Sequence, residues 1–235
     1  MGSGAVLGLK LVSFHRPLTY TYTYVSIIGM KRTAEEAAVT KQKLLEAALS
    51  VFSRQGYKSA RLQDIATEAD VTRGAIYHHF GNKAGLFMTL IQEAIQRSSN
   101  IVPQAIHEGG TFLEIMERIM VRGFELLETD VQVRQTMRLY LFHTEVDDEL
   151  SMFDIFLKEQ TVGTVQNAAQ FMQMGITQGV LRQDLDVETA ARAFVAFQNG
   201  VIHLWLLDPE AFSIREQASA LAGAFLHGLV HRERV

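Results

Sequence analysis

The sequence has no cysteine among its 235 residues and only three prolines. The absence of cysteine excludes a disulfide framework and a zinc site with thiolate ligands, and it is compatible with a reducing cytoplasm. No stretch approaches the roughly 18 uninterrupted apolar residues that a membrane-spanning helix needs. We therefore expect a cytoplasmic protein that does not enter a membrane.

Acidic residues are missing from residues 1–30 and unevenly spread over the rest. Residues 31–98 carry 10 Lys and Arg against 7 Asp and Glu, a net charge of +3, whereas residues 99–235 carry 10 against 19, a net charge of −9. A basic N-terminal module on an acidic body is expected of a protein that binds phosphates with one part only. Such differences in net charge between segments are common, so a second feature is needed before DNA binding can be inferred.

Residues 1–30 differ from the rest in pattern as well. Threonine and tyrosine alternate from Thr19 to Tyr24, a period of two that is typical of a strand, but no partner strand is evident downstream. The apolar part is interrupted by charged residues and a proline, which is not the pattern of a secretory signal. We predict a poorly ordered extension over residues 1–30, with Met30 as the natural start.

From Thr33 onward, apolar residues recur at spacings of three and four, which predicts helices only. Thr33 and Glu36 fit a capping box that would begin the first helix, and Gly56 is suited to cap its end. Thr111 with Glu114, and Asp186, fit later helix starts. The predicted helices cover about 33–55, 61–69, 73–79, a fourth that begins after Asn82, and then 111–128, 131–143, 149–178, 188–207 and 212–231.

Two short helices joined by a tight turn at Asp70 and braced by a longer helix form the layout of a helix-turn-helix, here over residues 61–80. In such a motif the second helix, here from Thr72, lies in the major groove. Gly74 lets the backbone approach DNA closely. Lys83, in the first turn of the next helix, opposes the helix dipole, so a bound phosphate would explain it. A plain surface helix with a solvated lysine stays the alternative.

This region resembles the TetR family of bacterial transcriptional regulators. The opening segment, residues 31–37, is similar to the multidrug-efflux repressors of the AcrR and TtgR kind, in which a tryptophan often stands where this chain has His78. The wider match consists of Ala47, Ala48, Phe52, Gly56, Tyr57, Asp64, Ile65, Ala66, the run from Val71 to Tyr77, His79, Phe80, Lys83, Leu86 and Phe87.

The resemblance implies an all-α protein with an N-terminal three-helix helix-turn-helix DNA-binding domain, residues 31–98, and a larger helical ligand-binding and dimerisation domain, residues 99–235. It implies a repressor that binds a palindromic operator as a homodimer through the last two helices and is released by a small hydrophobic effector. An activator, or a regulator without such an effector, stays the alternative. The expected DNA contacts are Arg61, Thr72, Arg73, Gly74, Ala75, Tyr77, His78, His79 and Lys83.

Seven methionines and eleven phenylalanines follow Lys83, and their adaptable bulk suits a promiscuous pocket, although most will be ordinary core. Two polar residues within an apolar helix are suited to orient a ligand. We predict a pocket formed by Met116, Met120, Phe124, Met137, Phe142, Phe171 and Met174, with Gln198 and Asn199 as the polar pair.

No glycine-rich phosphate loop, nucleophile elbow or zinc helix motif is present, so we expect neither enzymatic activity nor a cofactor. His227 and His231 have a spacing that can hold a metal, but no third ligand is well placed, and histidines at a helix C-terminus more often interact with its carbonyls. We expect no metal site. The net charge of −9 over residues 99–235 argues against an architectural DNA-coating protein, which needs a pervasively basic surface.

Overall fold

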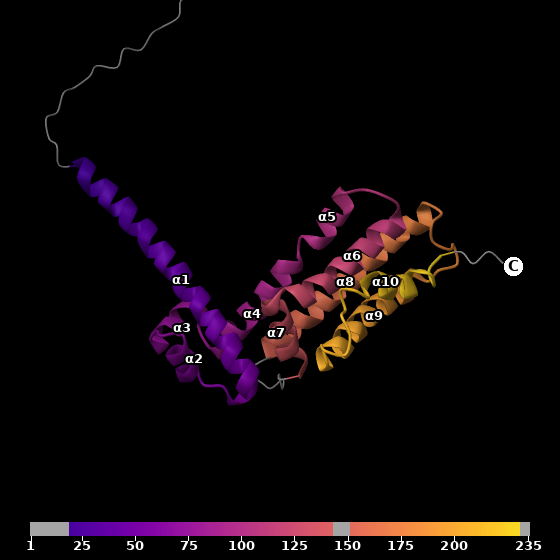
Figure 1. Cartoon of the computed structure of the whole chain (residues 1–235). Helices are drawn as coiled ribbons and strands as arrows, with labels where there is room; N and C mark the ends of the chain where they lie inside the picture. The colour runs from indigo at the N-terminus through magenta and orange to yellow at the C-terminus, as the bar shows by residue number, and fades with distance from the viewer. Residues whose placement is uncertain (1–18, 143–150, 231–235) are drawn as a thin grey trace, which may run out of the picture. The chain divides into compact units, whose positions relative to one another are not determined.

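The computed structural model describes residues 19–142 and 151–230. The described residues form ten α-helices, and their only strand-like pairing is an isolated bridge between Leu181 and Val230 (Figure 1). The predicted all-α class is therefore confirmed. Over the described residues, no helix is both long enough and apolar enough to cross a membrane. The described residues divide into two compact parts, one up to residue 42 and one from residue 43 onward.

The first helix, α1 (Thr19–Ser59), begins earlier than the sequence predicted. The predicted start at Thr33 is wrong, and residues 19–24 are helical in spite of their alternating pattern. A strand must bond its backbone to a neighbour, whereas a helix bonds its own backbone within the segment. Gly56 interrupts the regular helix with φ 76° and ψ 160°, and the positive φ favours glycine there, as predicted. The predicted end of the helix at this glycine is only partly right, because helical backbone resumes after it and continues to Ser59.

The helix-turn-helix consists of α2 (Leu62–Glu68) and α3 (Arg73–Phe80), close to the predicted boundaries. In the turn between them, the Val71 amide donates to the Ala66 carbonyl at 3.0 Å. Asp70 adopts φ 54°, a left-handed conformation that aspartate tolerates better than most residues. Thr72 occupies the predicted N-cap position of α3, but its side chain makes no capping hydrogen bond.

Helix α4 (Lys83–Ser98) starts immediately after α3. The Asn82 side chain accepts a hydrogen bond from the Gly85 amide at 2.7 Å, which confirms the predicted cap. A β-carbon added to Gly85 would lie only 2.1 Å from the carbonyl oxygen of Phe80. The absence of a side chain at this position therefore lets α4 begin so close to the end of α3.

The helix-turn-helix and its bracing helices share one buried core, to which two residues from later in the chain, Leu139 and Phe153, also belong. The ring of Phe87 lies 5.8 Å from that of Phe52 and 5.0 Å from that of Tyr57. Phe153, which follows the segment 143–150, packs its ring 5.0 Å from Phe87. Leu139 is also buried in this cluster. We call residues 43–98 the head; its core is closed partly by residues of the body.

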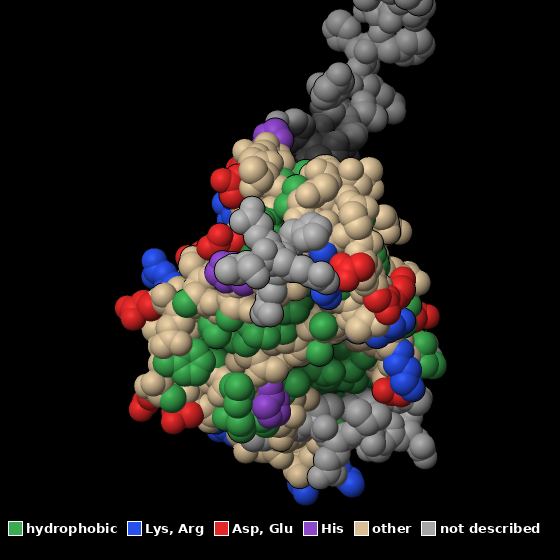
Figure 2. Space-filling view, turned by 90° about the vertical axis from the view of Figure 1, so that its right-hand side faces the viewer, with side chains coloured by type: hydrophobic (Ala, Val, Ile, Leu, Met, Phe, Trp, Pro, Cys, Tyr) green, Lys and Arg blue, Asp and Glu red, His purple; other side chains and the backbone are tan. Residues whose placement is uncertain are grey.

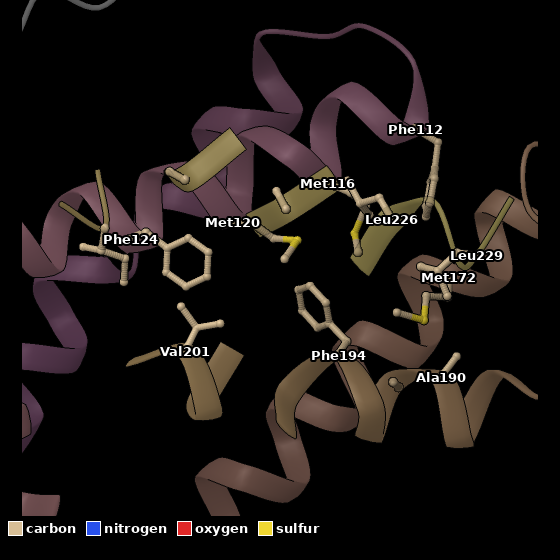
Figure 3. Packing of buried hydrophobic residues seen from close by; sticks show 14 of the residues in the cluster. Phe112, Met116, Met120, Phe124, Met172, Ala190, Phe194, Val201, Leu226 and Leu229 are labelled. Carbon is tan, nitrogen blue, oxygen red and sulfur yellow. The ribbon is translucent and has the colours of Figure 1, made fainter. Parts of the chain in front are cut away.

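The body (residues 99–230) has its own core, in which Met120, Phe124, Phe194 and Val201 point toward one another (Figure 3). Its longer helices match the predictions to within about two residues where described, and α5 was not predicted. Both capping-box hydrogen bonds between Thr111 and Glu114 are present. The body helices are α5 (Ile101–His107), α6 (Phe112–Thr129), α7 (Val131–Phe142), α8 (Ser151–Thr177), α9 (Val187–Leu207) and α10 (Ala218–Leu226).

The last predicted helix, over 212–231, is wrong in extent, because α10 covers only Ala218–Leu226. The Glu128 carboxylate of α6 accepts hydrogen bonds from the Ser213 hydroxyl at 3.1 Å and the Arg215 amide at 2.9 Å. These bonds hold the segment before α10 in turns. At the other end, Gly228 has a low helix propensity.

Candidate nucleic-acid interface and effector cavity

Helix α3 presents one exposed row of side chains. Arg73 and His78 are exposed, and 45% of the Tyr77 surface is accessible, a large fraction for an aromatic side chain. Ile76, on the opposite side of the helix, is fully buried in the head core. A short helix fixed by its inner face and open on its outer face has the geometry of a recognition helix.

The exposed row is organised before any ligand binds. The Arg73 guanidinium donates a 2.5 Å hydrogen bond to the Tyr77 hydroxyl and lies 5.3 Å from the centre of its ring. The His78 ring stands edge-on to the His79 ring at 5.0 Å. Such contacts restrict the rotamers of side chains that would otherwise lose conformational freedom on binding.

The other predicted DNA contacts surround this row. Thr72 and Gly74 are exposed at the start of α3, and Arg61 is exposed at the N-cap of α2. His79 is half-buried. Ala75 is also half-buried, packed against the head core, so it has little surface left for a base.

Lys83 has a defined position at the end of α1. Its ammonium lies 3.3 Å from the carbonyl oxygens of both Lys58 and Ala60, and 4.4 Å from the centre of the Tyr57 ring. A lysine beside carbonyls at the C-terminal end of a helix is electrostatically favourable. The side chain therefore joins α4 to the end of α1, a contact that the sequence did not reveal.

Helix α2 is tied to α1 by an ion pair. Both terminal guanidinium nitrogens of Arg54 contact the Glu68 carboxylate, the closer at 2.5 Å. Arg54 also donates a hydrogen bond to the Ser50 hydroxyl. The hydrogen bond from Arg54 holds the pKa of Glu68 below its ordinary value of 4.5. The carboxylate thus stays charged at neutral pH and fixes α2, which in turn positions the turn before α3.

An apolar cavity of about 200 Å³ lies between α4 and the helices of the body. Among the described residues, Ser98 and Gln198 are its only polar lining residues, and none of the described lining side chains is charged. Its walls come from α4, α6, α7 and α9, and the lining consists of Ala94, Ile95, Ser98, Gly123, Phe124, Leu126, Leu127, Val133, Met137, Gln198 and Ile202.

Three of the predicted pocket residues, Phe124, Met137 and Gln198, line this cavity. The α4 residues among the lining were not predicted, although Ala94 and Ser98 are small residues one turn apart. The other predicted residues lie elsewhere: Met116 and Met120 in the body core (Figure 3), Phe142 beside His203, Phe171 stacked on Phe112, and Met174 and Asn199 on the surface.

Apolar side chains also gather on the surface of α9 and α10. Leu204 and Leu207 of α9 are 64% and 56% exposed. Figure 2 looks onto the side of Figure 1 where α9 and α10 lie and shows hydrophobic side chains over a broad area, with charges mostly toward its edges. Exposed small residues accompany the leucines, namely Ala193, Ala196 and Gly200 on α9, and Ala220, Ala224 and Gly228 on or just after α10.

Metal binding finds no support in the described part of the chain, where no three His, Asp or Glu side chains come together as a metal site would need. His227 is exposed. His231, which has the metal-compatible spacing with His227 in the sequence, lies outside the described residues.

Comparison with known proteins connects the head and the body to transcriptional regulators. Residues 44–90 match the model of the bacterial regulatory proteins of the tetR family, and residues 111–231 match that of the C-terminal region of MAATS-type transcriptional repressors. The chain is 28% identical over 207 residues to the probable acrEF/envCD operon repressor of Escherichia coli K12, covering 87% of this chain and 93% of that protein.

Two examples illustrate the solved structures that share the fold. NalD, the secondary repressor of the MexAB-OprM multidrug efflux pump in Pseudomonas aeruginosa, superposes with a TM-score of 0.73 at 24% identity, covering 85% of this chain and all of that one. SmeT of Stenotrophomonas maltophilia, solved in complex with triclosan, gives a TM-score of 0.70 at 21% identity, covering 83% of this chain and 93% of that one.

Proposed function

Because this chain belongs to the TetR family of bacterial regulatory proteins, we propose that it binds a near-palindromic operator as a homodimer and leaves it when a small hydrophobic effector enters the body. The chain is a DNA-binding transcriptional repressor and not an enzyme. Its place of action is then the cytoplasm, where the DNA is. The observation that carries the proposal is the exposed, pre-arranged row on α3 above a fully buried Ile76.

On DNA, α3 enters the major groove and most of the proposed contacts hold phosphates, which fixes the register of the helix. Arg73 can also reach a guanine edge, and His78 faces the bases. Lys83 keeps its proposed phosphate contact, since an ammonium has three donors and the two carbonyls at the end of α1 occupy only two.

The apolar surface of α9 and α10 supports the proposed dimer. Leucines exposed by more than half are unfavourable on an isolated monomer, and the small residues beside them let helices of two subunits pack closely. A two-fold dimer presents two equivalent α3 helices, so the operator should be a near-palindrome with half-sites about 34–36 Å apart. Light scattering that finds a monomer at micromolar concentration would count against this arrangement.

The lining of the cavity supports a neutral, mostly apolar effector, because none of the described lining residues carries a charge that could bind a charged one. Pockets for drug-sized ligands usually measure about 300–1,000 Å³. The cavity here, about 200 Å³, must therefore widen to admit such a ligand, and α4 is one of its walls. Movement of α4 would change the spacing of the two heads and prevent simultaneous docking.

The test is operator affinity, at stated salt, with and without a panel of triclosan, hydrophobic drugs, flavonoids and fatty acyl compounds. A typical coupling of about 1–3 kcal/mol corresponds to a loss of roughly 5- to 150-fold. Tyr77→Ala and Lys83→Ala should weaken binding to all sequences, and His78→Ala should change sequence preference. Bulky substitution at Phe124, which lines the cavity, should blunt the ligand effect. A compound that binds the body tightly but never alters DNA affinity rules out the release mechanism.

A further inference from the structure

We propose that Arg97 and Asp130 form a latch that holds α4 against the turn between α6 and α7, keeping the cavity closed and the head in its DNA-binding position. Neither residue contacts DNA or effector in this proposal; both are positioning residues. The inference rests on the proposed function, because it assigns a regulatory role to the edge of the same cavity.

The latch joins the last turn of α4 to the start of α7. Arg97 Nη1 lies 3.0 Å from Asp130 Oδ2, and Arg97 Nη2 donates to the Gln132 side-chain oxygen. One guanidinium thus binds two acceptors from the α6–α7 junction. Planar, two-pronged contacts of this kind fix orientation as well as distance.

Asp130 is held in place by the backbone on its other side. Its Oδ1 accepts hydrogen bonds from the amides of Gln132 at 2.9 Å and Val133 at 3.1 Å, which caps α7. Burial acts to raise the pKa of Asp130, but the Val133 amide and the charge of Arg97 outweigh it and hold the pKa below its ordinary value of 3.8. The carboxylate is therefore ionised and anchored at neutral pH.

The latch spans two walls of the cavity at its edge. Ser98, directly after Arg97, lines the cavity from α4, while Leu127 and Val133, on either side of Asp130, line it from α6 and α7. A ligand that widens the cavity by separating these walls must lengthen or break the contact. Because α4 begins beside α3, the same separation displaces the head.

The exposure of the pair suits a regulatory contact better than one that stabilises the fold. The Arg97 side chain is 42% exposed and that of Asp130 20%. Ion pairs this open contribute little to the stability of a whole domain. They can still bias an equilibrium between two similar arrangements, where a small difference decides the populations.

The test is a double-mutant cycle with Arg97→Met, Asp130→Asn and the double variant. DNA fragments that the wild-type protein binds are first selected from random DNA, and the affinity of each variant for these fragments is then measured. Met keeps most of the arginine length, and Asn caps a helix as well as Asp does, so α7 should remain intact. Each single variant should weaken DNA binding by about two- to fivefold, and the double should be no weaker than the worse single.

The signs of the charge changes make the result diagnostic. Arg97→Met removes a positive charge and Asp130→Asn a negative one, so simple attraction to phosphate would move the two affinities in opposite directions. A lost latch moves both the same way. Lys158→Met and Asp154→Asn make the same charge changes in an exposed pair within α8 and should leave DNA affinity unchanged.

Nile red, a neutral apolar dye, provides a readout without DNA. If the latch closes the cavity, Arg97→Met and Asp130→Asn should each bind the dye about two- to fivefold more tightly than the wild type, with unchanged thermal midpoints. The control pair in α8 should not affect dye binding. Thermal midpoints that drop by many degrees would instead assign Arg97 and Asp130 a structural role and overturn the proposal.

Three other results also overturn the latch. The first is that the two single variants shift DNA affinity in opposite directions, the second is that their losses of DNA affinity add up in the double variant, and the third is that both single variants bind the dye as the wild type does. Failure of the proposed function looks different. If the variants behave as expected but no effector changes wild-type DNA affinity, the latch stands and ligand release is wrong. If the wild type selects no DNA, the proposal that the protein binds DNA is wrong. The dye-binding and thermal-stability measurements then test by themselves whether Arg97 and Asp130 hold the cavity closed.

Discussion

The head and the body are both helical, yet they expose different kinds of side chain. The head displays arginine, tyrosine and histidine on a short helix whose inner face is buried. The body displays leucine and small residues on α9 and α10, and together with α4 it lines a small apolar cavity. In the head, function depends on the identity of a few exposed side chains. In the body it depends on the space between helices, which many sequences can create.

The two regions meet at Phe153, whose replacement should have the largest effect. Phe153 is 1% exposed and contacts the rings of Phe87 in the head and Tyr140 in α7. Phe153→Ala should destabilise the protein by about 3–5 kcal/mol through lost burial and a cavity. Denaturant unfolding measures it. Met174→Ala, at a residue 49% exposed, is the matched control and should change stability by less than about 0.5 kcal/mol.

If head and body are one cooperative unit, the Phe153→Ala loss should appear in a single transition. Two separate transitions, with only one of them shifted, would contradict the shared core.

A substitution at Gly85 should affect the head more selectively. The alanine β-carbon would meet the Phe80 carbonyl at 2.1 Å, so α3 and α4 must separate. Gly85→Ala should cost about 1–3 kcal/mol of stability and lower DNA affinity by about tenfold or more. Gly163→Ala in α8 has open space around it and should instead stabilise by up to about 1 kcal/mol. Equal behaviour of the two variants would refute the close contact.

The turn of the motif gives a smaller effect. Because Asp70 has φ 54°, Asp70→Ala should cost about 1 kcal/mol, whereas Asp70→Gly should be neutral or stabilising. Thermal unfolding of both variants measures the difference. If alanine is tolerated as well as glycine, the left-handed conformation at this position is wrong.

The capping box of the body gives an effect no larger than this, and the contribution of Glu114, the smallest expected here, depends on pH. The Glu114 carboxylate accepts a hydrogen bond from the Thr111 amide at 2.7 Å, which holds the pKa of Glu114 below its ordinary value of 4.5. A lowered carboxyl pKa means that the contribution is complete above this value and is lost as the pH falls through the folded-state pKa.

Thr111→Ala should cost about 1 kcal/mol at neutral pH. Glu114→Gln should lower the thermal midpoint slightly at pH 7, and the difference from the wild type should shrink toward pH 3. A difference that persists at pH 3 would show that the charge of Glu114 is not involved.

The sequence predicted the head better than the body for a physical reason. Asn82 and Gly56 act locally, so their roles follow from their neighbours in the chain. The spacing of apolar residues likewise fixed which face of α3 is buried. The contact of Lys83 with the end of α1 joins residues far apart in sequence, and no local pattern reveals it.

In the body, composition indicated a methionine- and phenylalanine-rich interior without saying which side chains border empty space. Met120 and Phe124 occupy similar positions on α6, yet only Phe124 lines the cavity. The shortened α10 likewise depends on Glu128, a residue of another helix. Packing between helices decides such features, and sequence periodicity does not determine it.

The central claim is that α3 reads DNA as one half of a dimer, and selection from random DNA at a stated salt concentration tests it most directly. The account predicts enrichment of a near-palindrome bound by two chains, with half-sites about 34–36 Å apart, and no enrichment by Tyr77→Ala under the same conditions. Enrichment of an asymmetric site by a single chain, or equal enrichment by Tyr77→Ala, would contradict it.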